Sequence, residues 1–159
     1  MLTRIALRAF ALAVPVHFLW EMAQMGLFTG VSTEFWASIP TCALASVGDG
    51  VLTLAILTVG GVLFGRAAWP GRRDWRAWLA LAGLSVGVAV VMEWVNVYGL
   101  GRWAYDTDMV MIPGLRVGLT PVVQMLLLTP PILRWAAHAP ASRAPGTGQG
   151  APRQPGGHV

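Results

Sequence analysis

Three polar residues near the N-terminus, His17, Glu21 and Gln24, interrupt an otherwise apolar stretch, "PVHFLWEMAQMG" (15–26). Their spacing of four and then three residues places all three side chains on one face of a helix. A histidine beside a carboxylate suits proton transfer, and the same pair is able to present its side chains to one metal ion. Because each of these groups is costly to bury in hydrocarbon, we expect this face to meet polar groups of the protein and not lipid.

The other apolar segments supply partners for this face. Asp49 lies in "SVGDGVL", Glu93 and Asn96 lie three residues apart in "VMEWVNVYG", and Gln124 lies in "TPVVQML". Consecutive membrane-spanning helices alternate in direction, so these positions all fall at one depth, in the outer half of the bilayer. The sequence therefore predicts a polar pocket to which four helices contribute.

The chemistry of this pocket has three alternatives. In the first, it performs acid–base catalysis, and the candidate catalytic residues are His17, Glu21, Asp49 and Glu93. One histidine cannot neutralise three carboxylates, so either some carboxyl groups hold protons or a cation lies among them. In the second, the same four residues bind a divalent metal such as zinc, iron or manganese. In the third, the polar groups only hold the helices together through hydrogen bonds, each contributing about 0.6 kcal/mol.

The third connection, "GLGRWAYDTDMVMIPGLRVGLTP", is expected to lie over the outer mouth of the pocket. It is either a lid that orients the substrate or an interfacial aromatic anchor in which Arg102 pairs with an aspartate. Trp20 and Trp94 adjoin the pocket glutamates and are candidates for an apolar part of its lining, with packing in the core as the alternative that we favour for each alone. The candidate substrate-binding residues are Gln24, Asn96, Gln124, Trp20, Trp94, Trp103 and Tyr105.

Composition indicates an integral membrane protein. The chain has 159 residues, of which 55% are hydrophobic and only 11% are charged, whereas soluble domains carry about 25% charged residues. Four apolar segments approach the roughly 20 residues needed to cross hydrocarbon. We predict an all-α, polytopic bundle of four transmembrane helices with short loops, in which the spans cover residues 5–28, 41–64, 77–98 and 117–135.

The sequence also predicts where the transmembrane domain, residues 1–138, ends. Residues 139–159 are rich in proline and glycine and have no apolar periodicity, so we expect a disordered cytoplasmic tail. Pro130 and Pro131 predict a kink or an end of the fourth helix near the cytoplasm.

Arginine placement predicts the topology. The chain has 11 basic residues, all of them arginine, and a net charge of +4. Nine lie at the two termini and in the second connection, and two lie in the third connection. The positive-inside rule then places both termini in the cytoplasm of a bacterium, with the protein in the inner membrane. Since membrane orientation accounts for this charge, no nucleic-acid partner is expected.

Paired glycines predict close helix contacts. Gly61 and Gly65, and likewise Gly83 and Gly87, have the Gly-x-x-x-Gly spacing that lets two helix backbones approach. We expect these contacts to lie within the bundle, with an oligomer as the alternative.

The ordered motifs "HFLWEMAQ", "GDGVLTL", "EW" and "GRWAYDTDMVMIPGLRVGLTPVVQ" resemble a set of small, uncharacterised bacterial four-span membrane proteins over residues 15–135. This resemblance implies the fold and location but no activity. A weaker resemblance is to the emopamil-binding (EXPERA) sterol isomerase family. His17 and Glu21 match its His-x-x-x-Glu helix, Glu93 matches its further membrane glutamate, and this chain is shorter. In that family such residues move a proton on and off a sterol double bond.

These observations together predict a membrane protein whose pocket binds or converts a lipid or isoprenoid-like molecule. The alternatives are a non-catalytic membrane subunit or scaffold, in which the polar cluster holds helices or a partner, and a metal-binding membrane protein.

Overall fold

Four α-helices make up most of the protein. The computed structural model describes residues 2–65, 69–72 and 74–138. The all-α class is confirmed, and each predicted span coincides with one helix. The predicted tail, residues 139–159, lies outside the described residues. The helices are α1 (Leu2–Gln24), α2 (Phe35–Phe64), α3 (Trp75–Glu93) and α4 (Leu119–His138), with short helical turns η1 (Met25–Leu27), η2 (Trp69–Gly71) and η3 (Trp94–Gly99).

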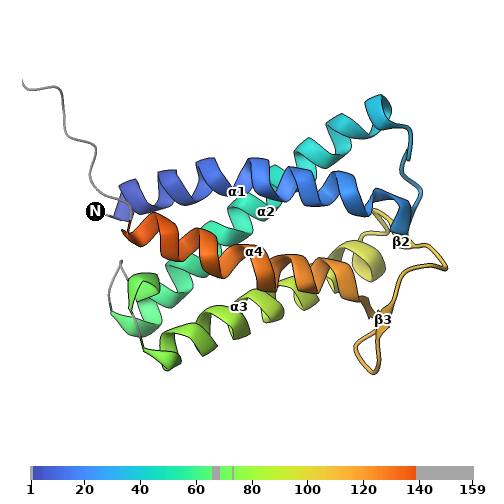
Figure 1. Ribbon diagram of the computed structural model, residues 1–159. Helices are drawn as coiled ribbons and strands as arrows, with labels where there is room; N and C mark the ends of the chain where they lie inside the picture. The colour runs from blue at the N-terminus through green and yellow to red at the C-terminus, as the bar shows by residue number, and fades with distance from the viewer. Residues whose placement is uncertain (1, 66–68, 73, 139–159) are drawn as a thin grey trace, which may run out of the picture.

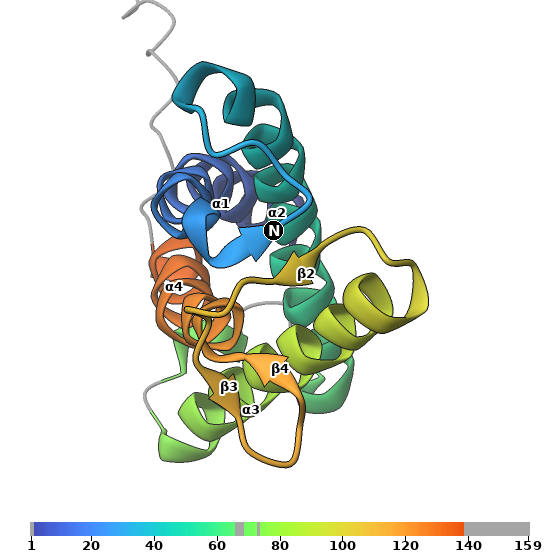
Figure 2. The ribbon, with the colours of Figure 1, turned by 90° about the vertical axis from the view of Figure 1, so that its right-hand side faces the viewer.

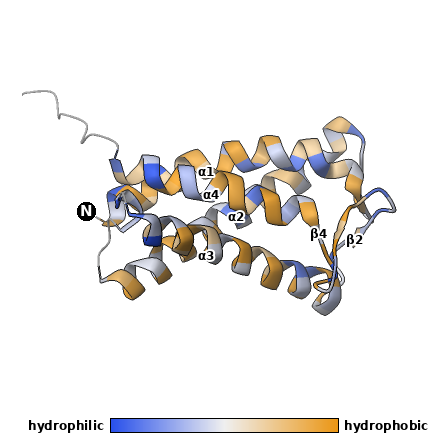
Figure 3. Ribbon diagram, turned by 60° about the horizontal axis from the view of Figure 1, so that its bottom comes forward, coloured by the Kyte–Doolittle hydropathy of each residue, from blue (hydrophilic) through white to orange (hydrophobic). Residues whose placement is uncertain are grey.

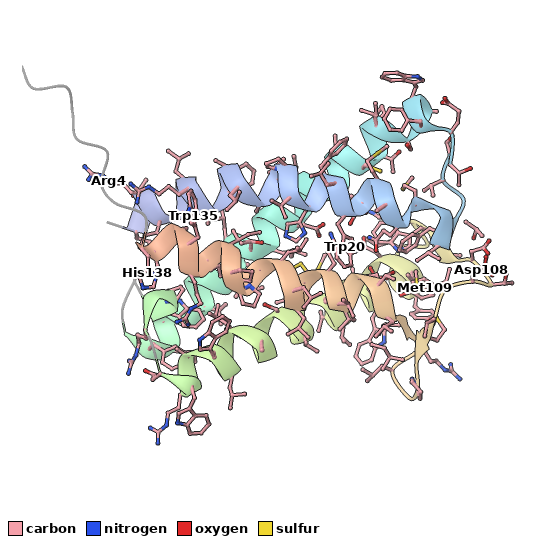
Figure 4. All side chains as sticks on the ribbon, viewed as in Figure 1. Arg4, Trp20, Asp108, Met109, Trp135 and His138 are labelled. Carbon is pink, nitrogen blue, oxygen red and sulfur yellow. The ribbon has the colours of Figure 1, made fainter. Side chains whose placement is uncertain are left out.

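The helices run along one another and share two ends (Figure 1). The start of α1, the end of α4 and the connection from α2 to α3 lie at one end, and the remaining connections lie at the other. Figure 4 marks the first end by Arg4 and His138 and the second by Asp108. We call these the terminal end and the loop end.

Three helices in the described part of the chain are long and apolar enough to cross a membrane: Leu2–Leu27, Phe35–Phe64 and Trp75–Gly99. Hydrophobic residues cover much of their length, as Figure 3 shows. The 20-residue helix α4 is not among the three, because Gln124, two prolines and Arg134 lower its hydropathy. The described part of the chain is therefore that of a membrane protein, with three apolar helices of spanning length.

Side-chain caps define where two helices begin. Glu34 accepts a hydrogen bond from the backbone N–H of Ala37 at 2.7 Å, so α2 starts at Phe35, earlier than predicted. Asp74 caps α3 in the same way, through the N–H of Ala77 at 2.7 Å. That hydrogen bond, together with the neighbouring Arg72, lowers the pKa of the Asp74 carboxyl below its usual value. Negative charge at a helix start is stabilising, because it satisfies free N–H groups and opposes the helix dipole.

Of the two alternatives predicted for Pro130 and Pro131, a kink or an end of the fourth helix, the end was wrong. Helix α4 continues through Pro130 and Pro131 to His138, and Pro130 is buried. A proline costs one backbone hydrogen bond, and here the packing of the last turns offsets that loss. Ile132 and Leu133, which follow the prolines, belong to the hydrophobic core.

Close backbone approach occurs at a glycine other than those predicted. A Cβ on Gly60 would lie 1.9 Å from the ring of Trp69, whereas a Cβ on Gly83 or Gly87 would meet no atom within 4 Å. Trp69 is fully buried, and its indole N–H donates to the carbonyl oxygen of Leu57 at 2.9 Å. Among the described residues, Gly83 and Gly87 thus make no close helix contact. Gly65 instead ends α2 with a left-handed φ of 63°.

Two short antiparallel ribbons occupy the loop end, which Figure 2 views face on. Strand β1 (Phe28–Thr29) pairs with β2 (Ala104–Tyr105), and β3 (Met111–Ile112) pairs with β4 (Val117–Gly118). The first ribbon therefore joins the first and third connections. We call β1 and β2 the ribbon cover. The sequence analysis did not predict either ribbon.

Candidate functional site

The side-chain amide of Gln124 joins three helices. Its Nε2 atom on α4 lies 3.0 Å from Nδ1 of His17 and 2.9 Å from Oε1 of Glu21, both on α1. The same atom lies 2.9 Å from Oδ2 of Asp49 on α2. The structure therefore brings four of the predicted polar residues into direct contact.

A second amide fixes the orientation of the first. The indole N–H of Trp20 donates to Oε1 of Gln24 at 3.1 Å. An indole nitrogen is a donor only, so this contact identifies the Gln24 oxygen and leaves its nitrogen to donate elsewhere. That nitrogen donates to Glu21 and to Oε1 of Gln124, both at 3.0 Å. Since the Gln124 oxygen is thus occupied as an acceptor, its nitrogen must face His17 and the two carboxyl groups.

The number of hydrogens at Gln124 constrains the protonation of its neighbours. An amide nitrogen carries two hydrogens, yet three acceptor atoms lie within 3.0 Å of it. The amide therefore cannot give each of the three groups a separate hydrogen. His17 Nδ1 also lies 3.5 Å from Oδ2 of Asp49. Either two acceptors share one amide hydrogen, or one of the three groups turns a hydrogen of its own towards a neighbour.

His17 lies behind the other polar residues. Its side chain is fully buried, and its Nε2 atom has no hydrogen-bond partner among the described residues. It is also absent from the residues that line the cavity described below. His17 is therefore placed to orient Gln124 and Asp49, and not to touch a ligand in that cavity.

Glu93 on α3 makes a separate contact with the ribbon cover. The Tyr105 hydroxyl donates to Oε2 of Glu93 at 2.6 Å. Burial and this carboxylate both raise the pKa of Tyr105 above its usual value, so the hydroxyl keeps its proton and stays a donor. Tyr105 is fixed by Phe28, at 5.9 Å between ring centroids, and by Gly118, where a Cβ would lie 3.0 Å from the ring. Together these contacts anchor Glu93 to the loop end.

A cavity of about 650 Å³ lies beside these groups. Its volume falls in the range of sites for drug-sized molecules. Most of its lining is apolar and comes from all four helices and from the loop end. Its polar lining includes Glu21, Gln24, Asp49, Glu93, Asn96 and Gln124, together with Thr41 and Arg102. The first six were predicted as pocket residues from sequence.

The aromatic candidates lie in different places. Trp103 lines the cavity, and its indole nitrogen is close enough to Glu93 to interact with it but lacks a full hydrogen bond within the described chain. Tyr105 and Trp20 do not line the cavity themselves. Each donates a hydrogen bond to a residue that does line it. In Figure 4, Trp20 lies in the half of the bundle nearer the loop end. Trp94 does not line the cavity: it is 44% exposed and donates to the carbonyl of Leu115 at 2.8 Å.

Several lining residues were missed in the sequence. Phe28 and Arg102 come from the loop end, and three methionines, Met25, Met92 and Met125, come from helix faces. The methionines give no sequence signal, because a flexible apolar side chain is equally expected in any core. Phe28 is the last residue of the first predicted span, four residues after Gln24 of the polar face, and this position was the available signal.

The four residues proposed as metal ligands do not all meet at one point, because Glu93 contacts Tyr105 and lies apart from the other three. Within the described residues, no three His, Cys, Asp or Glu side chains are arranged to hold a metal ion. The nitrogen of Gln124 occupies the position between His17, Glu21 and Asp49 where an ion would sit. An amide N–H repels a cation, so the donor set does not fit a metal at this point.

Comparison with protein-family models, with curated proteins and with solved structures finds no match to this chain.

Proposed function

We propose that the protein is an integral inner-membrane protein that binds a lipid or isoprenoid-like molecule in this cavity and acts on it by acid–base chemistry. One observation carries the proposal: a cavity of about 650 Å³ with three carboxyl side chains in its lining lies among apolar helices. Carboxyl groups in hydrocarbon are costly, and they are commonly functional where they occur.

The carboxyl groups of the cavity lining belong to two separate clusters. Glu21 and Asp49 share the Gln124 amide, whereas Glu93 is held by Tyr105. Two carboxyl groups that share one donor repel each other when both are charged, which favours one proton between them. Glu93, which accepts a hydrogen bond, is suited to the opposite role of base. A proton donor and a proton acceptor that reach the same ligand are the minimum for acid–base catalysis.

The proposed topology has four spans with both termini in the cytoplasm. It is supported by the arginine distribution and by the position of α4, which runs beside the three apolar helices and ends where α1 begins (Figure 1). An even number of crossings returns the chain to its starting side. Reporter fusions after His138 and at Asp108 test this, and a periplasmic signal after His138 contradicts it.

A second candidate function is a non-catalytic subunit whose polar residues hold the bundle together. The hydrogen bonds of Gln124 to two other helices favour it, because they satisfy one another without a ligand. Glu93 distinguishes the two functions, since it contacts Tyr105 and not the Gln124 cluster.

The experiment compares wild type with Glu93→Gln and with Leu127→Ala, an exposed position on α4. Each full-length protein is purified in nanodiscs of native lipid, and bound small molecules are identified by mass spectrometry. The proposal expects one amphiphile enriched in wild type and Leu127→Ala, and reduced or chemically altered in Glu93→Gln, with unchanged thermal stability. A subunit instead predicts no enriched compound in any of the three, and that result would overturn the proposal.

A further inference from the structure

The cavity reaches the side of the bundle that would face lipid. Leu44 and Val51 on α2 line it and are 74% and 54% exposed, and Gly48 between them is exposed as well. On an apolar helix of spanning length, an exposed side chain contacts acyl chains. The cavity therefore has an opening at the membrane-facing surface of α2.

The loop end of the cavity is covered. Phe28 of the ribbon cover lines the cavity and packs edge-on against Trp103, at 6.4 Å between ring centroids. The cover is tied down by its strand pairing and by a backbone hydrogen bond from Asp106 to Leu27 at 2.9 Å. A molecule in the bilayer thus meets an opening, whereas a molecule in water meets packed aromatic rings.

On one side of the cavity, the atoms that can still form a hydrogen bond to a ligand are mainly acceptors. We define the polar wall as the side chains of Glu21, Gln24, Asp49 and Gln124. The nitrogens of Gln24 and Gln124 already lie within 3.0 Å of acceptor oxygens or His17. Each carboxyl group offers about four acceptor sites, and the amides fill only some of them. The polar wall therefore favours a ligand head group that donates hydrogen bonds.

Charge at the polar wall excludes a negative head group. Its two acidic side chains share the cavity lining with a third, Glu93. A further negative charge close to these groups is unfavourable at low dielectric. Arg102 is the one cationic side chain among the described lining residues, and it is exposed in the loop after η3. An anion held by Arg102 would sit at the loop-end rim and not at the wall.

Building on the proposed function, we propose that the ligand is a bilayer-resident amphiphile whose head group donates hydrogen bonds and carries no negative charge. It enters sideways past Gly48 and places that head group against the polar wall, with its chain along the apolar lining. A long-chain alcohol and a long-chain amine share this donor chemistry.

The head-group test uses four photoreactive probes with one diazirine-bearing alkyl chain, ending in a hydroxyl, an amine, a carboxylic acid or a methyl ether. Each is added to the full-length protein in nanodiscs, and crosslinked peptides are mapped by mass spectrometry. The expected result is labelling of cavity peptides by the alcohol, the amine or both, roughly 2- to 10-fold above the ether, which is the worth of one net hydrogen bond. The ratio of alcohol to amine identifies the donor.

The other outcomes of this labelling experiment each contradict one part of the proposals. Equal labelling by all four probes overturns the head-group inference and leaves the proposed function standing. Preferred labelling by the acid, lost in Arg102→Gln, overturns it in favour of an anion at the rim. Cavity peptides that no probe labels contradict the proposed function itself.

The entry route is tested with Gly48→Trp, which fills the opening. A Cβ at Gly48 meets no atom within 4 Å, so the backbone accepts the change. The matched control is Val59→Trp, an exposed position on the same helix outside the cavity lining. Labelling by the preferred probe should slow several-fold in Gly48→Trp and not in the control. Equal rates in both variants overturn entry from the side.

Discussion

Gln124 on α4 and His17 on α1 lie 3.0 Å apart, from Nε2 to Nδ1, although 107 residues separate them in the chain. The contact is buried, and the same nitrogen also reaches a carboxyl group on α1 and another on α2. One amide therefore connects the first two helices to the last. The bundle closes around this side chain, so its removal should affect the whole fold.

The variant Gln124→Leu keeps the approximate size of the side chain and removes both donated hydrogens. It leaves Glu21 and Asp49 without their shared donor, and a buried acceptor left unpaired costs about 1–3 kcal/mol. We expect the free energy of unfolding to fall by about 2 kcal/mol. Thermal unfolding in detergent measures this, with Leu127→Ala as the exposed control on the same helix. Equal stability of Gln124→Leu and wild type would show that the cluster does not hold the bundle.

The variant Tyr105→Phe removes only the hydroxyl that donates to Glu93. The ring contact with Phe28 remains, so the ribbon cover should stay folded. A hydrogen bond to a charged group is worth about 1.5–3 kcal/mol, so we expect the free energy of unfolding, followed by thermal unfolding in detergent, to fall by about 1.5 kcal/mol or more. Tyr98→Phe is the control, because Tyr98 donates to the carbonyl of Arg116 on the exposed surface. Equal loss in both variants contradicts a specific role for Tyr105.

The raised pKa of Tyr105 predicts a loss of stability in alkali. Burial is the main cause, and the hydrogen bond to Glu93 adds to it. The folded state then holds this proton more tightly than the unfolded state, whose tyrosine titrates near pH 10. Stability from this group is complete below about pH 10 and is lost as the pH rises towards the folded pKa. Unfolding measured from pH 8 to 11 should show a decline that is smaller in Tyr105→Phe. Identical pH profiles for wild type and variant contradict this assignment.

Two glycine substitutions should have opposite effects. Gly60→Ala places a methyl group 1.9 Å from the Trp69 ring, and overpacking of this kind costs about 1–3 kcal/mol. Gly83→Ala meets no atom within 4 Å, so the gain in helix propensity of about 0.5–1 kcal/mol should dominate. Thermal unfolding of both variants under one condition checks the signs. A neutral Gly60→Ala contradicts the packing of Trp69 under α2.

The helices and the depth of the polar residues could be predicted from the sequence. Long apolar runs specify helices in a membrane, because each must satisfy its own backbone hydrogen bonds. The cost of burying Glu21, Asp49 and Glu93 predicts that they face inward, and helix alternation predicts a common level. Their contacts with Gln124 and with the cavity agree with both predictions.

The pairing across distant connections could not be predicted. Phe28 and Tyr105 meet through a two-residue ribbon, which is too short to leave a pattern of alternating residues. The spacing of residues along the sequence also could not predict the roles of His17 and Trp94. Helix periodicity gives the face on which a side chain lies, but not whether another side chain, such as Gln124, comes between it and the cavity.

Strands β1 and β2 also set an order of assembly. β1 is made early, directly after α1, but its partner β2 follows only after α2 and α3 have been synthesised. The ribbon cover is thus a contact of high sequence separation, a kind that forms late because a long loop must close first. Helix α4, which supplies Gln124 to the cavity, follows β2 in the chain. The ribbon cover is therefore synthesised before the last wall of the cavity that it covers.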